Sequence, residues 1–326
     1  MIRTIEAATL CLCMALTGCS SRDPESSVSS EIITTAQSTV TTPETTVKKY
    51  PDNCIVDPSV FERLDKEINI EFKDKTVIES GEIKGRRYSL TFELSDWAGN
   101  TTADKIGELS RLFWQVYPVL YERFGKYSDA PSDVVLIIEN KGYEIAEAWE
   151  NKIHLHDMWL WNYPEDYDCI THELAHIIQN GWNGENLEYD SYIERFADYC
   201  RFIYCVDDGR YNDHGWTLQT AKDESSRETS VRFLVWLDYN LSGSGRDFMK
   251  DYYLICTKGE YPSSEWDSAW KKLFEGTAFE GRDIDEVWKE YQTSDFAILS
   301  SYAATGETSE LLAKYDARKK AKSLNG

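Results

Sequence analysis

The chain has 326 residues, of which 41% are hydrophobic and 13% aromatic, so it can bury the core of one large domain or two small ones. It carries 57 acidic residues against 35 basic ones, which gives a formal net charge of −22. Nucleic-acid binding needs clustered Lys and Arg to neutralise phosphates, so this balance argues against a nucleic-acid partner. The acidic charge favours solubility and does not indicate a fold.

Residues 1–18 are expected to be a lipoprotein signal peptide. Arg3 precedes a short apolar run, residues 7–16, that is too short to span a bilayer. The sequence Leu-Thr-Gly-Cys at 16–19 resembles a bacterial lipobox, in which cleavage precedes the Cys and its thiol then carries lipid. Lipidated Cys19 would anchor an exported protein in the bacterial cell envelope, at either the inner or the outer membrane.

Residues 19–52 are predicted to be a linker that starts at the lipidated cysteine. Of the 30 residues from 20 to 49, 14 are Ser or Thr and none is aromatic. Such a segment cannot bury enough surface to offset its chain entropy, so it is expected to be a flexible stalk. A folded domain is predicted at 53–295, followed by a tail at 296–326. Five cysteines remain in residues 53–326, so at least one is unpaired, and their spacing indicates no particular pairing.

Hydrophobic periodicity predicts the elements of this domain. Strands are expected at 88–94, 133–139 and 152–156, where the sequence alternates or is continuously apolar. Helical spacing of apolar residues predicts helices at 103–124, 168–180, 192–205, 228–241, 266–274 and 284–291. Strands early and helices late predict an α+β domain with a mostly helical C-terminal part.

One predicted helix carries the sequence THELAHIIQN at 171–180. His172 and His176 are four residues apart, so on a helix both imidazoles point the same way and can bind one Zn²⁺. Glu173 would then lie beside the metal, where its carboxylate can take a proton from water as general base. An H-E-x-x-H match arises by chance at a rate on the order of one per cent, so its helical context matters.

The next predicted helix offers a third ligand. Glu194 and Asp198 share one face of it, while the opposite face is apolar. Glu194 is therefore the candidate third metal ligand, and Asp198 could accept the N–H of a ligand histidine. The alternative is that both acids simply face solvent. A serine-hydrolase motif G-x-S-x-G is absent, and Cys169 at a helix start is more typical of packing than of catalysis.

These segments resemble the basic secretory protein family, plant-type secreted proteins with bacterial relatives that are classed among gluzincin-like zinc peptidases. The similarity covers about residues 85–293. It rests on THELAHIIQNGW, on YIERFADYCR against the family's E-G-I-A-D-Y-V-R, on GYEIAEAWENKIHLHDMWL, on ETSVRFLVWLDYN against T-A-R-F-L, and on VWKEYQTS against L-W-x-x-Y. The order and spacing of all five segments agree.

The resemblance implies a zincin-like fold in which a twisted N-terminal sheet lies over the H-E-x-x-H helix. Its edge strand, taken here as 152–156, would pair with an extended substrate. His154 and His156 on that strand are expected to line the cleft or face solvent rather than bind metal. The chain departs from the family at Arg195, which replaces a Gly, and in its acidic charge. Arg227 aligns with a family Tyr and is a candidate oxyanion donor beside His214 and Tyr211.

Three functions remain possible at this stage. The first is a zinc-dependent endopeptidase of the bacterial cell surface that acts on protein or peptide substrates, with Glu173 as general base. The second is a catalytically silent surface binding or adhesion lipoprotein on a zincin scaffold. The third is a metal-dependent hydrolase of a non-peptide substrate such as wall glycan. The intact set of ligands and base favours the first, while substrate specificity and oligomeric state stay open.

Overall fold

The computed structural model describes residues 68–73, 75–94, 100–140, 145–164, 166–180, 187–204, 227, 230–243, 245–258 and 265–294. The chain divides into two units, Met1–Lys48 and Lys49–Gly326, and every described residue belongs to the second. The predicted signal peptide, lipidation site, linker and tail therefore lie outside the described residues. Among the helices that are described, none is long and apolar enough to span a bilayer.

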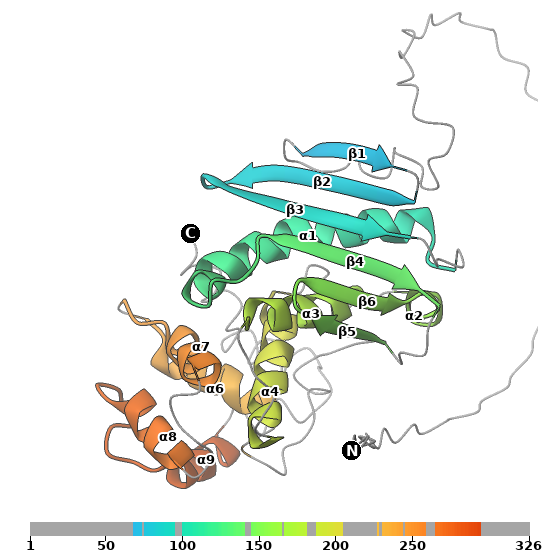
Figure 1. Cartoon of the computed structure of the whole chain (residues 1–326). Helices are drawn as coiled ribbons and strands as arrows, with labels where there is room; N and C mark the ends of the chain where they lie inside the picture. Colours follow the sequence, from blue (N-terminus) through green and yellow to red (C-terminus); the bar gives the residue numbers. More distant parts are fainter. Residues whose placement is uncertain are drawn as a thin grey trace, which may run out of the picture. The chain divides into compact units, whose positions relative to one another are not determined.

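Six strands form one sheet in the order β1-β2-β3-β4-β6-β5 (Figure 1). Their bounds are β1 Asn69–Lys73, β2 Thr76–Ile83, β3 Arg86–Glu93, β4 Asp133–Glu139, β5 Ala146–Trp149 and β6 Lys152–His156. The first three strands form an antiparallel meander, β4 and β6 run parallel to β3, and β5 returns antiparallel to β6. Alternating burial along β3 and β4 gives the sheet one apolar face.

The expectation that Lys152–His156 forms the edge strand is wrong. This strand, β6, pairs with β4 on one side and with β5 on the other, so β5 occupies the edge. The sequence of β5, Ala-Glu-Ala-Trp, is too short for its alternation to predict a strand. Pairing with β6 across a turn at 150–151 makes it one, because a partner strand supplies the hydrogen bonds that a lone tetrapeptide lacks.

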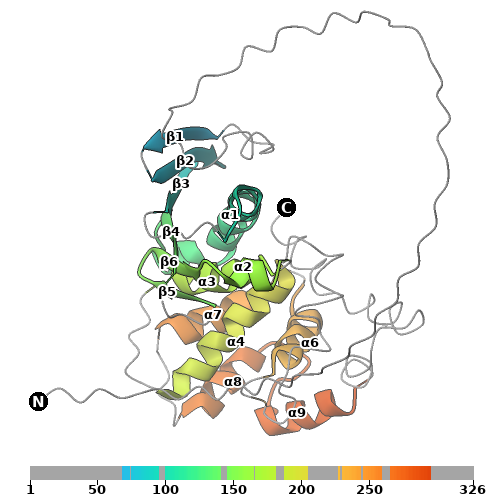
Figure 2. The same ribbon diagram turned by 90° about the vertical axis from the view of Figure 1, so that its right-hand side faces the viewer.

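The described helices are α1 Ala103–Arg123, η2 Gly125–Tyr127, α2 Trp159–Asn162, α3 Cys169–Ile178, α4 Leu187–Ile203, α6 Val231–Leu241, α7 Phe248–Lys258, α8 Trp266–Phe274 and α9 Ile284–Gln292. Figures 1 and 2 show α1 and α3 on the same face of the sheet, with α4 and the later helices beyond α3. The α+β class and the mostly helical C-terminal part are therefore confirmed. Among these helices, α7 is the long one that the apolar periodicity did not predict.

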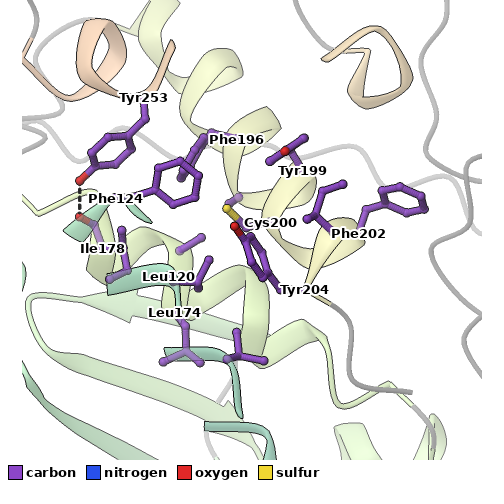
Figure 3. Close-up of a cluster of buried hydrophobic side chains, with 14 of the residues drawn as sticks. Leu120, Phe124, Leu174, Ile178, Phe196, Tyr199, Cys200, Phe202, Tyr204 and Tyr253 are labelled. Carbon is purple, nitrogen blue, oxygen red and sulfur yellow. Dashed lines mark hydrogen bonds between the residues drawn. The ribbon is translucent and has the colours of Figure 1, made fainter. Parts of the chain in front are cut away.

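The apolar faces of α3 and α4 pack into one core with α1 and α7 (Figure 3). Leu174 and Ile178 of α3 and Phe196 of α4 are almost completely buried there. The hydroxyl of Tyr253 on α7 donates a 2.7 Å hydrogen bond to the carbonyl of Ile178, at the end of α3. Because these faces are locked in the core, the opposite polar faces of α3 and α4 have fixed positions.

A buried ion network connects α4 to α1 and α6. Arg123, at the end of α1, makes two 2.7 Å hydrogen bonds to Asp247 and one of 2.9 Å to Tyr204. Tyr199 of α4 donates a 2.6 Å bond to Asp238 of α6. Buried charges of this kind are tolerated only when their hydrogen bonds are made, so the network constrains how α4 sits against α1 and α6.

Glu79 is a buried carboxyl between β2 and α1. One oxygen, Oε2, accepts hydrogen bonds of 2.5 Å from Trp114 Nε1 and 2.8 Å from Ser110 Oγ, while Oε1 is buried without a partner among the described residues. Burial raises the pKa of Glu79 to about 7, against the lowering effect of these two donors. The ordinary pKa of this carboxyl is about 4.5, so folding is accompanied by uptake of a proton at pH values between 4.5 and about 7.

The stability of the protein is therefore expected to rise as pH falls from about 8 to 5. The protonated carboxyl is favoured in the folded state, so raising the pH from about 4.5 to about 7 removes on the order of 3 kcal/mol of folding free energy at this residue. Glu79→Gln should lack this component. Urea unfolding of both proteins at several pH values measures it, and curves that stay parallel from pH 5 to 8 would contradict the prediction.

Candidate metal centre

His172 and His176 project from the polar face of α3. Their Nε2 atoms are 3.0 Å apart, and their rings are tilted by 78° with centroids 4.7 Å apart. Both are partly buried, since the other face of α3 is fixed in the core. The four-residue spacing on a helix thus brings the two nitrogen atoms to one point, as the sequence predicted.

Glu194 reaches the same point from α4. Its Oε2 lies 3.2 Å from His172 Nε2, and its Oε1 lies 3.4 Å from His176 Nε2. The side chain of Glu194 is 58% exposed, so the cluster opens to solvent. Among the described residues, these three form the group of His, Cys, Asp or Glu side chains whose ligand atoms lie close enough to hold a metal ion.

The spacing of the three ligand groups fits zinc. Ligand atoms at 2.0–2.1 Å from a tetrahedral zinc ion lie roughly 3.3 Å from one another. The two Nε2 atoms are 3.0 Å apart, and the two carboxylate oxygens of Glu194 lie 3.2 Å and 3.4 Å from one histidine nitrogen each. Two histidines with one glutamate are a ligand set used by catalytic zinc sites, which keep the fourth position for water or substrate. The exposure of Glu194 is consistent with such an open position.

Each histidine is held by a second side chain at its Nδ1 atom. Asp198 Oδ1 lies 2.8 Å from His172 Nδ1, the contact that the sequence suggested for it. Gln179 Oε1 lies 2.9 Å from His176 Nδ1, and Gln179 Nε2 donates to the carbonyl of Ile193 on α4. Both acceptors require the proton on Nδ1, so they leave each Nε2 available to a metal.

Gln179 was not predicted as a site residue. The signal was present, because Gln179 follows His176 by three residues and so shares its helix face. The sequence could not show that its amide also reaches α4 beside Glu194. Through Ile193, Gln179 joins the helix that carries two ligands to the helix that carries the third.

Replacing Gln179 with leucine is expected to weaken zinc binding about 10- to 100-fold, the usual effect of removing a side chain that orients a ligand. Leucine has a similar volume, but it can neither accept a hydrogen bond from His176 Nδ1 nor donate one to the Ile193 carbonyl. Asn180→Ala is the matched control, because within the described residues the side chain of Asn180 donates to the carbonyls of Ser128 and Asp129 and not to a candidate ligand. Competition with a chromophoric chelator measures both affinities, and equal losses would show that Gln179 does not act through His176.

Three carboxylates set the charge of this cluster. Burial alone would lower the pKa of His172, but Asp198, Glu194 and Glu173 raise it to about 10. Burial would likewise raise the pKa of Glu194, yet hydrogen bonds with the two imidazoles hold it well below its usual range. The metal-free cluster therefore carries a proton at neutral pH. A metal ion must displace that proton, so metal affinity falls as the solution becomes more acidic.

Glu173 is buried, with 7% of its surface exposed. Burial raises the pKa of Glu173, and the neighbouring His172 and His176 partly oppose this shift. A carboxylate with a raised pKa is a better proton acceptor than one in water. The structure thus places the predicted general base beside the two candidate ligands and away from bulk solvent.

The other histidines and cysteines whose side chains are described lie outside this group. His154 Nδ1 lies 2.7 Å from Oε1 of the buried Glu139, and His156 Nδ1 accepts a hydrogen bond from the backbone of Met158. Cys169 and Cys200 are unpaired and buried, and burial raises the pKa of both thiols well above the usual value. Buried neutral thiols are packing residues rather than nucleophiles.

Arg227, one of the three candidate oxyanion donors, is paired with a carboxylate. The side chain of Arg227 reaches α9, where its Nε lies 3.0 Å from Asp285 Oδ1. Its backbone carbonyl accepts a hydrogen bond from Arg195, whose buried guanidinium also bonds the Tyr252 hydroxyl. His214 and Tyr211, the other two candidates, lie outside the described residues.

Comparisons with known proteins add no assignment. No family model matches the chain, and neither curated proteins nor solved structures give a significant match. The resemblance to the basic secretory protein family therefore stays a prediction, and the residues of the site carry the functional argument.

Proposed function

We propose that this chain is a zinc-dependent endopeptidase with a zincin-like fold, anchored in the bacterial cell envelope through Cys19. The observation that carries the proposal is the convergence of His172, His176 and Glu194 at zinc-ligand spacing beside the buried Glu173. The resemblance of five segments to a family of secreted zinc peptidases points the same way.

The reaction that fits this arrangement is hydrolysis of a peptide bond. A zinc ion held by the three ligands would supply Lewis acidity, polarising the substrate carbonyl and acidifying water. Glu173 accepts the proton of the attacking water and passes it to the leaving amine nitrogen. Asp198 and Gln179 keep the His172 and His176 rings in the tautomer and orientation that binding requires.

The edge strand β5 offers a place for the substrate backbone. The N–H of His156 donates to the carbonyl of Ile145, and hydrogen-bonded pairs alternate along an antiparallel ladder. The backbone groups of Glu147 therefore face β6, while those of Ala146 and Ala148 face the free edge. An extended peptide could add to this edge as a further strand, and α3 packs beside it.

Removal and return of metal test the proposal on the purified protein. We expect about one zinc per chain, hydrolysis of unfolded casein, loss of activity with a chelator and recovery with zinc. Metal without hydrolysis of any protein would favour the silent binding lipoprotein. Hydrolysis of wall glycan instead of casein would favour the third candidate. Absence of bound metal would contradict the ligand assignment.

A further inference from the structure

The edge strand β5 also carries two exposed side chains that face away from α3. Side chains alternate along a strand, so Ala146 and Ala148 face the side where α3 packs, and Glu147 and Trp149 face the other. Trp149 is 72% exposed, the highest value among the large hydrophobic residues described. Glu147 is also exposed, and its carboxylate forms no ion pair within the described part of the chain.

Glu147 and Trp149 lie at positions where the side chains of an added strand would come closest to β5. The backbones of Glu147 and Trp149 turn towards β6, so a peptide added antiparallel at the free edge would meet them in non-hydrogen-bonded pairs. In such pairs the Cα atoms are only about 4.5 Å apart and the side chains are close. The substrate residues opposite these two positions would therefore be selected by direct side-chain contact.

We propose that Trp149 and Glu147 determine the specificity of this site for a peptide with a large apolar residue followed, two positions later, by Lys or Arg. An indole opposite an aromatic or branched side chain, and a carboxylate opposite a cation, are favourable cross-strand pairs. In an antiparallel partner the residue facing Glu147 comes two positions after the one facing Trp149. The net charge of −22 further attracts basic peptides.

This inference rests on the proposed function and deepens it by naming the substrate class. The same selectivity is expected for peptide binding, because a peptide can add to β5 without being hydrolysed. The experiment therefore has a cleavage arm and a binding arm, so that failure of the peptidase proposal and failure of the specificity proposal can be distinguished.

In the cleavage arm, a peptide library is hydrolysed by the wild type, Glu147→Lys and Trp149→Ala. We expect Glu147→Lys to change the preferred Lys or Arg of the peptide to an acidic residue. Trp149→Ala should remove the preference for a large apolar residue two positions before that charged residue. Loss of either cross-strand contact with the peptide should lower kcat/KM about two- to five-fold, which corresponds to the usual energy of such a pair. Trp161→Ala is the matched control, because Trp161 on α2 is 61% exposed but lies outside the edge strand.

In the binding arm, the same peptides are titrated against Glu173→Gln, alone and combined with each substitution. Ala148→Pro removes an edge N–H without touching the β5–β6 ladder, so it should weaken every peptide, while Ala148→Ser should not. Unchanged preferences in Glu147→Lys and Trp149→Ala would overturn the inference even if casein is cleaved. The expected preferences without any hydrolysis would support it and count against the peptidase.

Discussion

Replacing Glu173 with glutamine is expected to lower the rate of peptide hydrolysis by about two to four orders of magnitude while zinc stays bound, because this is the usual contribution of a general base. Glutamine has nearly the same volume as glutamate, so it fills the same buried space, but its amide cannot accept the proton of water. The three candidate ligands are unchanged in the variant. The measurement is kcat/KM on a quenched peptide together with zinc content.

Glu173→Asp provides the matched comparison. It keeps the carboxylate but withdraws it by one methylene, so we expect activity between those of the wild type and the glutamine variant. Full activity in Glu173→Gln would remove the general-base assignment. Loss of zinc in Glu173→Gln would show instead that this buried side chain supports the metal, and that the loss of hydrolysis is indirect.

Replacing Glu194 with glutamine is expected to weaken zinc binding by more than the roughly 10- to 100-fold predicted for Gln179→Leu. The charge of Glu194 lies within 3.4 Å of both histidine nitrogens, and a neutral amide is a poor zinc ligand. The side chain is largely exposed, so the substitution costs little folding stability. Chelator competition measures the affinity, and thermal unfolding of the metal-free protein checks the fold.

Glu82→Gln is the control for this substitution, because Glu82 is an exposed carboxylate on β2. Zinc affinity should be unchanged there. If Glu194→Gln binds zinc as tightly as the control, the third ligand must come from another residue. If substitution of His172 or His176 abolishes zinc binding while Glu194→Gln does not, the two histidines of α3 hold the metal without Glu194.

The local sequence was sufficient to predict the metal-binding face of α3. The helix was expected at 168–180 and is observed at Cys169–Ile178, with His172 and His176 on one side and apolar residues on the other. The periodicity of α4 likewise predicted that Glu194 and Asp198 share a polar face. Both inferences depend only on the 3.6-residue repeat, which is a property of each helix by itself.

The strands were harder to predict. In β2 the buried Glu79 and Gly81 interrupt the apolar alternation that marks a strand. A Cβ at Gly81 would come within 2.6 Å of Ile68 Cδ1 and within 3.3 Å of the Trp114 ring on α1, so a larger residue would force these side chains to shift. Glu79 and Gly81 are explained by their contacts with α1, whose contacting residues lie more than 30 positions later in the chain.

The amino-acid sequence by itself determined the longer described helices except α7, the faces that they bury and the side chains that could hold a metal. Only the tertiary structure decided that Glu194 meets the two histidines, that Gln179 joins α3 to α4, and that β5 rather than β6 is the edge strand. The physical reason is range: a helix repeat is set by neighbours within four residues, whereas strand order and helix docking depend on contacts between segments far apart in the chain.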